Sequence, residues 1–177
     1  RTGSHVDLYQ FTEEYVKENG FWAIIADGPE EVRRGVRRVL REGADQVKLW
    51  ASGGDNWPHD RNGDVHYSME EIQMCVDEAH RQKGTLVCAH AENKESIRMC
   101  VEAGVDTIEH GEDLDEDLAE LMAEKGTILV PTLALIVNWY RDFIPTGENS
   151  FRKIRPDAFL HRDVPPSDEA GIEYSEN

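Results

Sequence analysis

Hydrophobic residues follow a helical period in some segments of the chain and form short continuous runs in others. Residues 29–44, PEEVRRGVRRVLREGA, begin with a proline and two acids and carry apolar residues at helical spacing. This pattern predicts an amphipathic helix that ends near Gly43. The next segment, QVKLWASGG at residues 46–54, is a β-prone run that closes on small residues, so it predicts a strand followed by a turn.

The alternation of helix and strand continues beyond this point. Ser68 and Glu71 have the spacing of a capping box, which predicts a helix from Ser68 to about Lys83, ended by Gly84. Two further helices are predicted over residues 94–104 and 115–126, and four strands near residues 45–51, 85–91, 105–110 and 127–133. The segments RTGSH and FWAIIAD are candidates for the end of another strand.

Strict alternation of strands and helices predicts an α/β fold in which a parallel sheet is connected by right-handed crossovers. After Pro131 the pattern weakens. The segment LALIVNWYRDFI could open a helix, and the rest of the chain is rich in proline, glycine and charge. We therefore expect two parts, an α/β portion over residues 1–135 and an extension over residues 136–177.

The amino-acid composition limits the kinds of molecule that the protein is expected to bind. The chain has 177 residues, of which 39% are hydrophobic, and its net charge is −17 from 36 acidic and 19 basic residues. Such an excess of negative charge repels phosphate backbones and anionic lipids, which argues against nucleic acid and membrane surfaces as partners. No apolar run approaches the roughly 20 residues of a spanning helix, and the N-terminus lacks a signal-peptide pattern.

Cysteine usage points to a reducing compartment. Cys75, Cys88 and Cys100 are odd in number and form no C-x-x-C pair, so neither a disulfide framework nor a structural zinc ribbon is indicated. We expect these thiols to be buried packing residues and the protein to be cytoplasmic.

Three side chains with metal chemistry lie toward the carboxyl ends of different predicted strands: Lys48, His90 and His110. In parallel α/β folds the functional groups gather at these ends, where the loops into the helices begin. We therefore expect the three side chains to converge on one point, with Val47 and Leu49 packing on the opposite face under the helices.

Alternation within each strand predicts which neighbours share a face with the histidines. It places His90 with Cys88 and opposite Ala89, and it places His110 with Ile108 and opposite Glu109. A lysine on the same inward face must be neutralised, paired or chemically altered, because burying a bare ammonium group costs several kcal/mol.

Two imidazoles and a lysine that can be carbamylated suit a divalent ion, and nitrogen ligands favour zinc. The alternative is that a strand-end histidine only binds a loop carbonyl, which is the preferred interpretation for a single histidine. Two histidines at equivalent positions, with a lysine at a third, favour the metal. His59 and His66 lie in the loop after Lys48, where contact with a substrate is possible but a solvated loop histidine is the favoured interpretation.

Four segments resemble the central part of the amidohydrolase superfamily, and more narrowly its imidazolonepropionase and Xaa-Pro dipeptidase-like branch. They are GADQVKLWASGG, SMEEIQMCVDEAHRQKGTLVCAHA, AGVDTIEHG and EKGTILVPTL, in the family's order. The resemblance covers about residues 1–135. It implies a (β/α)8 TIM barrel, present here from about the end of strand 3 to strand 7, with one or two divalent metals at its carboxyl face.

The resemblance also implies roles for individual residues. Lys48 matches the fourth-strand lysine whose carbamate bridges two metals, and His90 and His110 match the metal histidines of the fifth and sixth strands. RTGSH resembles the loop after the third strand, where His5 would approach the carboxylate or carbonyl of the substrate. The implied cofactor is Zn²⁺, with Mn²⁺ or Co²⁺ as other candidates.

Two parts of the family's site have no counterpart in this sequence: the H-x-H pair of the first strand and the aspartate of the eighth, which shuttles the proton. No catalytic residue is therefore assigned. The intact protein is expected to hydrolyse amide bonds in small molecules such as dipeptides, N-acyl amino acids or cyclic amides, by a metal-activated water. The alternative is a catalytically incomplete fragment that acts as a folded unit and pairs with a second copy or with the remainder of the barrel.

Overall fold

The computed structural model describes Glu14 and residues 23–54, 60–82 and 84–134 of the chain. In chain order its elements are α2 (Pro29–Arg41), β1 (Gln46–Trp50), α3 (Met69–His80), β2 (Leu86–Ala91), α4 (Lys94–Ala103), β3 (Thr107–His110), α5 (Glu116–Lys125) and β4 (Ile128–Val130). All of them belong to a compact unit that spans Arg1–Pro131.

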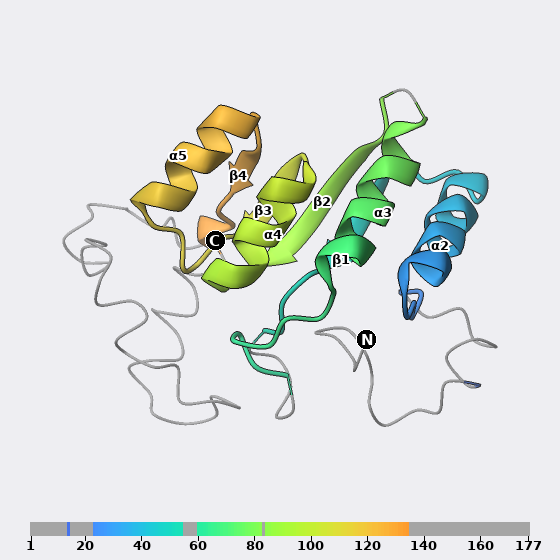
Figure 1. Cartoon of the computed structure of the whole chain (residues 1–177), viewed down its shortest axis with the longest axis horizontal. Helices are drawn as coiled ribbons and strands as arrows, with labels where there is room; N and C mark the ends of the chain where they lie inside the picture. The colour runs from blue at the N-terminus through green and yellow to red at the C-terminus, as the bar shows by residue number, and fades with distance from the viewer. Residues whose placement is uncertain (1–13, 15–22, 55–59, 83, 135–177) are drawn as a thin grey trace, which may run out of the picture. The chain divides into compact units, whose positions relative to one another are not determined.

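The strands form one parallel sheet in the order β1-β2-β3-β4. The helices α2 to α5 lie side by side on one face of it (Figure 1). The predicted α/β class with a parallel sheet is thus confirmed. Of the two candidates for a further strand, residues 23–27 are irregular and RTGSH lies outside the described residues.

Local sequence signals explain where the helices begin and end. Ser68 and Glu71 form the predicted capping box, in which the Ser68 hydroxyl accepts from the Glu71 N–H and the Glu71 carboxylate accepts from the Ser68 N–H. Gly104 and Gly126 follow α4 and α5 in the left-handed conformation that glycine adopts without a steric penalty.

The sequence overestimated the length of several elements. Helix α3 ends at His80 and not near Lys83, and β4 spans only Ile128–Val130 and not the predicted 127–133. Pro131 explains the second difference, because proline has no N–H to donate to a neighbouring strand.

The core lies between the sheet and the helices. Val47 and Leu49 of β1 are buried there, as predicted. The three cysteines are free and buried, which confirms their prediction as packing residues. Burial raises the pKa of Cys75 and of Cys100 to about 12, so both are thiols at neutral pH.

Glu71 joins two helix starts, because one of its carboxylate oxygens accepts from the Ser68 N–H and the other from the Gly28 N–H, each at 2.7 Å. Glu71→Ala should lower the free energy of unfolding by about 1–3 kcal/mol, since it leaves two half-buried donors without acceptors. The matched control is Glu70→Ala, an exposed acid in the same helical turn. Urea unfolding of both variants checks this, and equal losses would contradict it.

Candidate metal centre

The candidate site lies on the face of the sheet opposite the helices. In the strand register Lys48 pairs with Cys88, and His90 pairs with Glu109. Paired residues of neighbouring parallel strands point to the same side, and residues two apart in one strand do so too. Lys48, His90 and Glu109 therefore share one face, as predicted for the first two.

The predicted partners of His110 were wrong. Ile108 pairs with Ala89 and is fully buried in the core on the helix side, so it lies on the face opposite His90, and Glu109 lies on the same face as His90. His110 still reaches His90, because its backbone turns into the left-handed region at φ 73°. The two imidazole rings meet edge to face with their centroids 4.7 Å apart.

Lys48 does not stand alone on this face. Its Nζ forms an ion pair with the carboxylate of Glu109. This ion pair crosses β2 and joins β1 to β3. The side chains of Lys48 and Glu109 are 29% and 21% exposed. Burial lowers the pKa of Lys48 to about 8. The Glu109 carboxylate acts in the opposite direction, because a close negative charge favours the ammonium form.

Glu92 is a functional candidate that the sequence interpretation missed. One ligand atom from each of His90, Glu92 and His110 can be chosen so that all three lie within 4.8 Å of one another. His90 and Glu92 are buried, with 1% and 8% of their surface exposed. Ligands of one zinc ion at about 2.0–2.2 Å stand up to roughly 4 Å apart, so this donor set fits a divalent ion after small movements. The one feature of the sequence that pointed to Glu92 as a possible ligand was its position two residues after His90.

His90 also binds a loop carbonyl. Its Nε2 lies 3.0 Å from the oxygen of Gly53 and 3.5 Å from Glu92 Oε1. The alternative drawn from the sequence, a histidine that binds a loop carbonyl, therefore describes a real contact. It does not compete with a metal, because a histidine that binds a metal through one ring nitrogen commonly donates the other N–H to a carbonyl or carboxylate.

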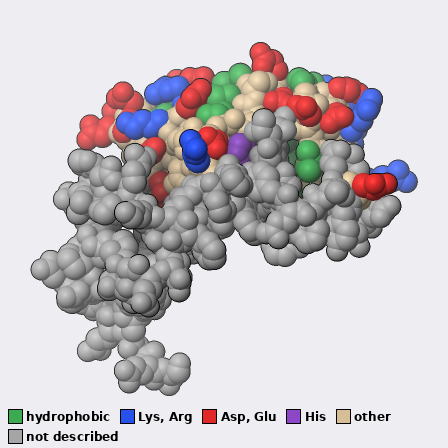
Figure 2. Space-filling view, turned by 90° about the horizontal axis from the view of Figure 1, so that it is seen from below, with side chains coloured by type: hydrophobic (Ala, Val, Ile, Leu, Met, Phe, Trp, Pro, Cys, Tyr) green, Lys and Arg blue, Asp and Glu red, His purple; other side chains and the backbone are tan. Residues whose placement is uncertain are grey.

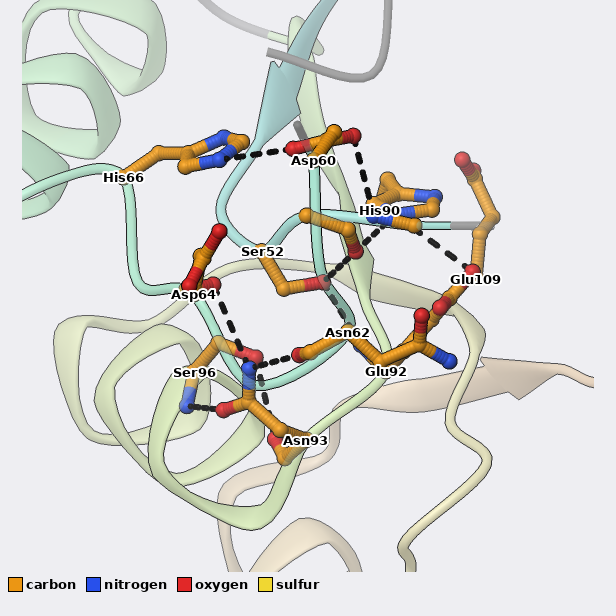
Figure 3. Close-up of polar contacts among 12 residues, drawn as sticks. Ser52, Asp60, Asn62, Asp64, His66, His90, Glu92, Asn93, Ser96 and Glu109 are labelled. Atoms are coloured by element: carbon orange, nitrogen blue, oxygen red, sulfur yellow. Dashed lines mark hydrogen bonds and ion pairs between the residues drawn. The ribbon is translucent and has the colours of Figure 1, made fainter. Parts of the chain in front are cut away.

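The loop between β1 and α3 folds back over this site. Ser52 and Val65 form an antiparallel bridge within it, and Asp60 and His66 are buried beneath, with His66 Nε2 3.2 Å from Asp60 Oδ1 (Figure 3). The favoured prediction of a solvated histidine is thus wrong for His66. His59 and the proposed substrate residue His5 lie outside the described residues.

Asn93 ties this loop to the start of α4. Its side-chain oxygen accepts from the Ser96 N–H at 2.8 Å and caps the helix. Its amide nitrogen donates to the backbone oxygens of Asn62 and Asp64 (Figure 3). One side chain therefore fixes both the helix and the loop next to Glu92.

A model of the amidohydrolase family matches residues 8–167. The chain belongs to the amidohydrolase family. It is 41% identical over 121 residues to ochratoxinase from Aspergillus niger. Among solved structures it resembles a prolidase complexed with N-methylphosphonate-L-proline, at 42% identity and a TM-score of 0.67, and a Xaa-Pro dipeptidase with bound methionine, at 28% identity and a TM-score of 0.70.

The chain spans only part of these relatives. The matches cover 66%, 75% and 89% of this chain, but 25% of ochratoxinase, 33% of the prolidase and 38% of the dipeptidase. Together with the four parallel strands and their helices, this extent agrees with the expected portion of a (β/α)8 barrel.

The described surface carries both signs of charge. Figure 2 shows acidic and basic side chains near one another on the face drawn there. Within the described ranges, the helices are too short or too polar to cross a lipid bilayer.

The Lys48–Glu109 ion pair gives a prediction about ionisation. Glu109→Gln should lower the pKa of Lys48, because the amide no longer favours the ammonium form while burial still opposes it. The pH dependence of acetylation at Lys48, followed by mass spectrometry, measures this pKa. Glu95→Gln, an exposed acid in α4, is the control. A Lys48 pKa that is unchanged or raised in Glu109→Gln would contradict the ion pair.

Proposed function

We propose that the intact protein is a metal-dependent hydrolase of amide bonds in small molecules. The observation that carries this proposal is the meeting of His90, Glu92 and His110, from the carboxyl ends of two neighbouring strands, in a chain of the amidohydrolase family. Membership of that family supports amide hydrolysis as the reaction class.

The names of the relatives support the substrate class. A prolidase and a Xaa-Pro dipeptidase are among the similar structures, and ochratoxinase is among the similar sequences. We therefore favour dipeptides and N-acyl amino acids as substrates, with cyclic amides as a wider possibility. His5 is proposed to contact the carboxylate or carbonyl of the substrate.

His90 and His110 are proposed as nitrogen ligands of a divalent ion, with zinc preferred and manganese or cobalt as other candidates. Glu92 adds a carboxylate oxygen to this donor set. When bound, the ion supplies polarisation of the amide carbonyl and acidification of water.

Lys48 is proposed to act as a carbamate. Only a neutral amine reacts with carbon dioxide, and a pKa of about 8 makes the neutral form accessible near physiological pH. Carbamylation replaces the ammonium by a negative group, so the attraction to Glu109 becomes repulsion. Glu109 must then turn away from Lys48, which frees its carboxylate to face a cationic group of the substrate or solvent.

The remaining strands of the barrel have to come from elsewhere in the intact protein or from a second copy. Ile128 and Val130 of β4 are 62% and 39% exposed, and such apolar side chains on a strand favour coverage by further structure. We propose a small-molecule substrate, a barrel completed in one of these ways, and a cytoplasmic location, which the free thiols favour.

Replacement of Lys48 tests the proposal directly. Lys48→Ala should reduce kcat/KM on dipeptides and N-acyl amino acids by more than about 100-fold. Loss of a residue that only supports a metal ligand costs roughly 10- to 100-fold, and loss of Lys48 as a proposed metal ligand should cost more. Lys94→Ala removes an exposed lysine that pairs with Asp115 and should have little effect.

The same assay is repeated after removal of metal and after its addition. Chelation should abolish hydrolysis by the parent protein, and zinc, manganese or cobalt should restore it. A parent protein that hydrolyses these amides equally well after complete removal of metal, or a Lys48→Ala variant with full activity, would exclude the proposed function.

A further inference from the structure

The peptide group between Gly53 and Gly54 lies between the buried carboxyl group of Asp60 and the imidazole of His90, a candidate metal ligand. Its N–H donates to Asp60 Oδ2 at 3.0 Å, and its carbonyl oxygen lies 3.0 Å from His90 Nε2. The peptide group is planar and its N–H and C=O point in opposite directions, so a contact that fixes one end also fixes the other. Figure 3 shows the side chains of Asp60 and His90 close to one another.

The backbone here is packed too closely for any residue but glycine at position 53. A Cβ atom on Gly53 would lie 2.1 Å from the carbonyl oxygen of Arg61 and 2.7 Å from Asp60 Oδ1. The Gly53 carbonyl also accepts from the Ser52 hydroxyl at 2.8 Å, and the Gly53 N–H donates to the carbonyl of Asp64 at 3.0 Å. The peptide group is thus held from several sides.

Asp60 is fully buried, with 0% of its surface exposed. Burial of a carboxylate costs several kcal/mol unless donors compensate for the lost water. The Gly54 N–H supplies one donor, and the imidazole of His66 lies close to the other oxygen, with Nε2 3.2 Å away. His66 is itself held, because its backbone N–H donates to the Ala51 carbonyl at 2.9 Å.

We propose that Asp60 is a positioning residue for His90. It holds the Gly53–Gly54 peptide so that the Gly53 carbonyl accepts the Nε2–H of His90, which sets the tautomer of the ring. The proposal rests on the proposed function only in taking His90 as a metal ligand.

Hydrogen bonds in series strengthen this arrangement. An acceptor on the N–H of a peptide polarises its C=O and makes the oxygen a better acceptor. A carboxyl group commonly orients a metal-binding histidine by direct contact. Here the Gly53–Gly54 peptide group stands between the carboxyl group and the histidine. Asp60 in the β1–α3 loop therefore controls the tautomer of His90 in β2.

The test uses metal-free intact protein labelled with ¹⁵N-histidine. Long-range ¹H–¹⁵N spectra at pH 8 report which ring nitrogen of His90 carries the proton, and cobalt titration reports metal affinity. In the parent protein Nε2 should be protonated. In Asp60→Ala, His90 should populate both tautomers, and the affinity for cobalt should fall by roughly 10- to 100-fold.

Asp64→Ala is the matched control, because Asp64 is exposed in the same loop and its side chain accepts the backbone N–H of Arg61. It should leave both measurements unchanged. An Asp60→Ala protein with the parent tautomer and the parent cobalt affinity would overturn the proposal, and the contact of His90 with Glu92 would then explain the tautomer.

Asp60→Asn decides the matter if Asp60→Ala does not fold. A neutral amide oxygen is a weaker acceptor than a carboxylate, so it polarises the Gly53–Gly54 peptide less and the second tautomer of His90 should become more populated. An unchanged His90 spectrum in Asp60→Asn would overturn the proposal. If the parent protein binds no cobalt, the proposed metal function fails, while the His90 tautomer in each variant still tests the role of Asp60.

Discussion

The hydrogen-bonded register of β2 between β1 and β3 is the constraint on which the rest of the site depends. It places Lys48, His90 and Glu109 on the sheet face away from the helices, and it brings Glu109 within reach of Lys48, diagonally across the middle strand. A shift of one residue in either pairing would send these side chains into the apolar layer under the helices. The packing of Val47, Ala89 and Ile108 in that layer therefore stabilises the arrangement of the polar face as well.

The loop after β1 is the second determinant of the site. Its close approach depends on Gly53, on the buried pair of Asp60 and His66, and on the side chain of Asn93 at the start of α4. Each of these groups contacts the loop backbone or another group within the loop. The described residues of the loop are thus held from several sides, and the Gly53 carbonyl contacts a strand-end histidine more than thirty residues later in the chain.

Much of this structure could be predicted from sequence, because the signals are local. Helical spacing after Pro29 and the capping box at Ser68 mark helix starts, and alternation of helices and short apolar runs indicates a parallel sheet. Alternation predicted the sides of the residues in β1 and β2 correctly. It placed Ile108 and Glu109 of β3 on the wrong faces, because it took His110 as its reference and the backbone turn at His110 breaks the alternation there.

Long-range polar contacts were harder to predict. Nothing in the loop sequence indicates that Asp60 and His66 are buried together, since both residue types are usually exposed. Glu92 and Glu109 looked like ordinary polar residues next to histidines, and their roles emerge only when neighbouring strands are in register.

The left-handed backbone at His110 limits which residues this position can hold. His110 and Gly111 have φ values of 73° and 65°, and a Cβ on Gly111 would lie 2.6 Å from Leu129 Cδ1. Histidine, asparagine and aspartate tolerate such a conformation far better than β-branched residues do. The backbone therefore constrains the two residues together: asparagine or aspartate can adopt this conformation and still offer an oxygen donor, whereas valine, isoleucine or threonine would be strained at position 110.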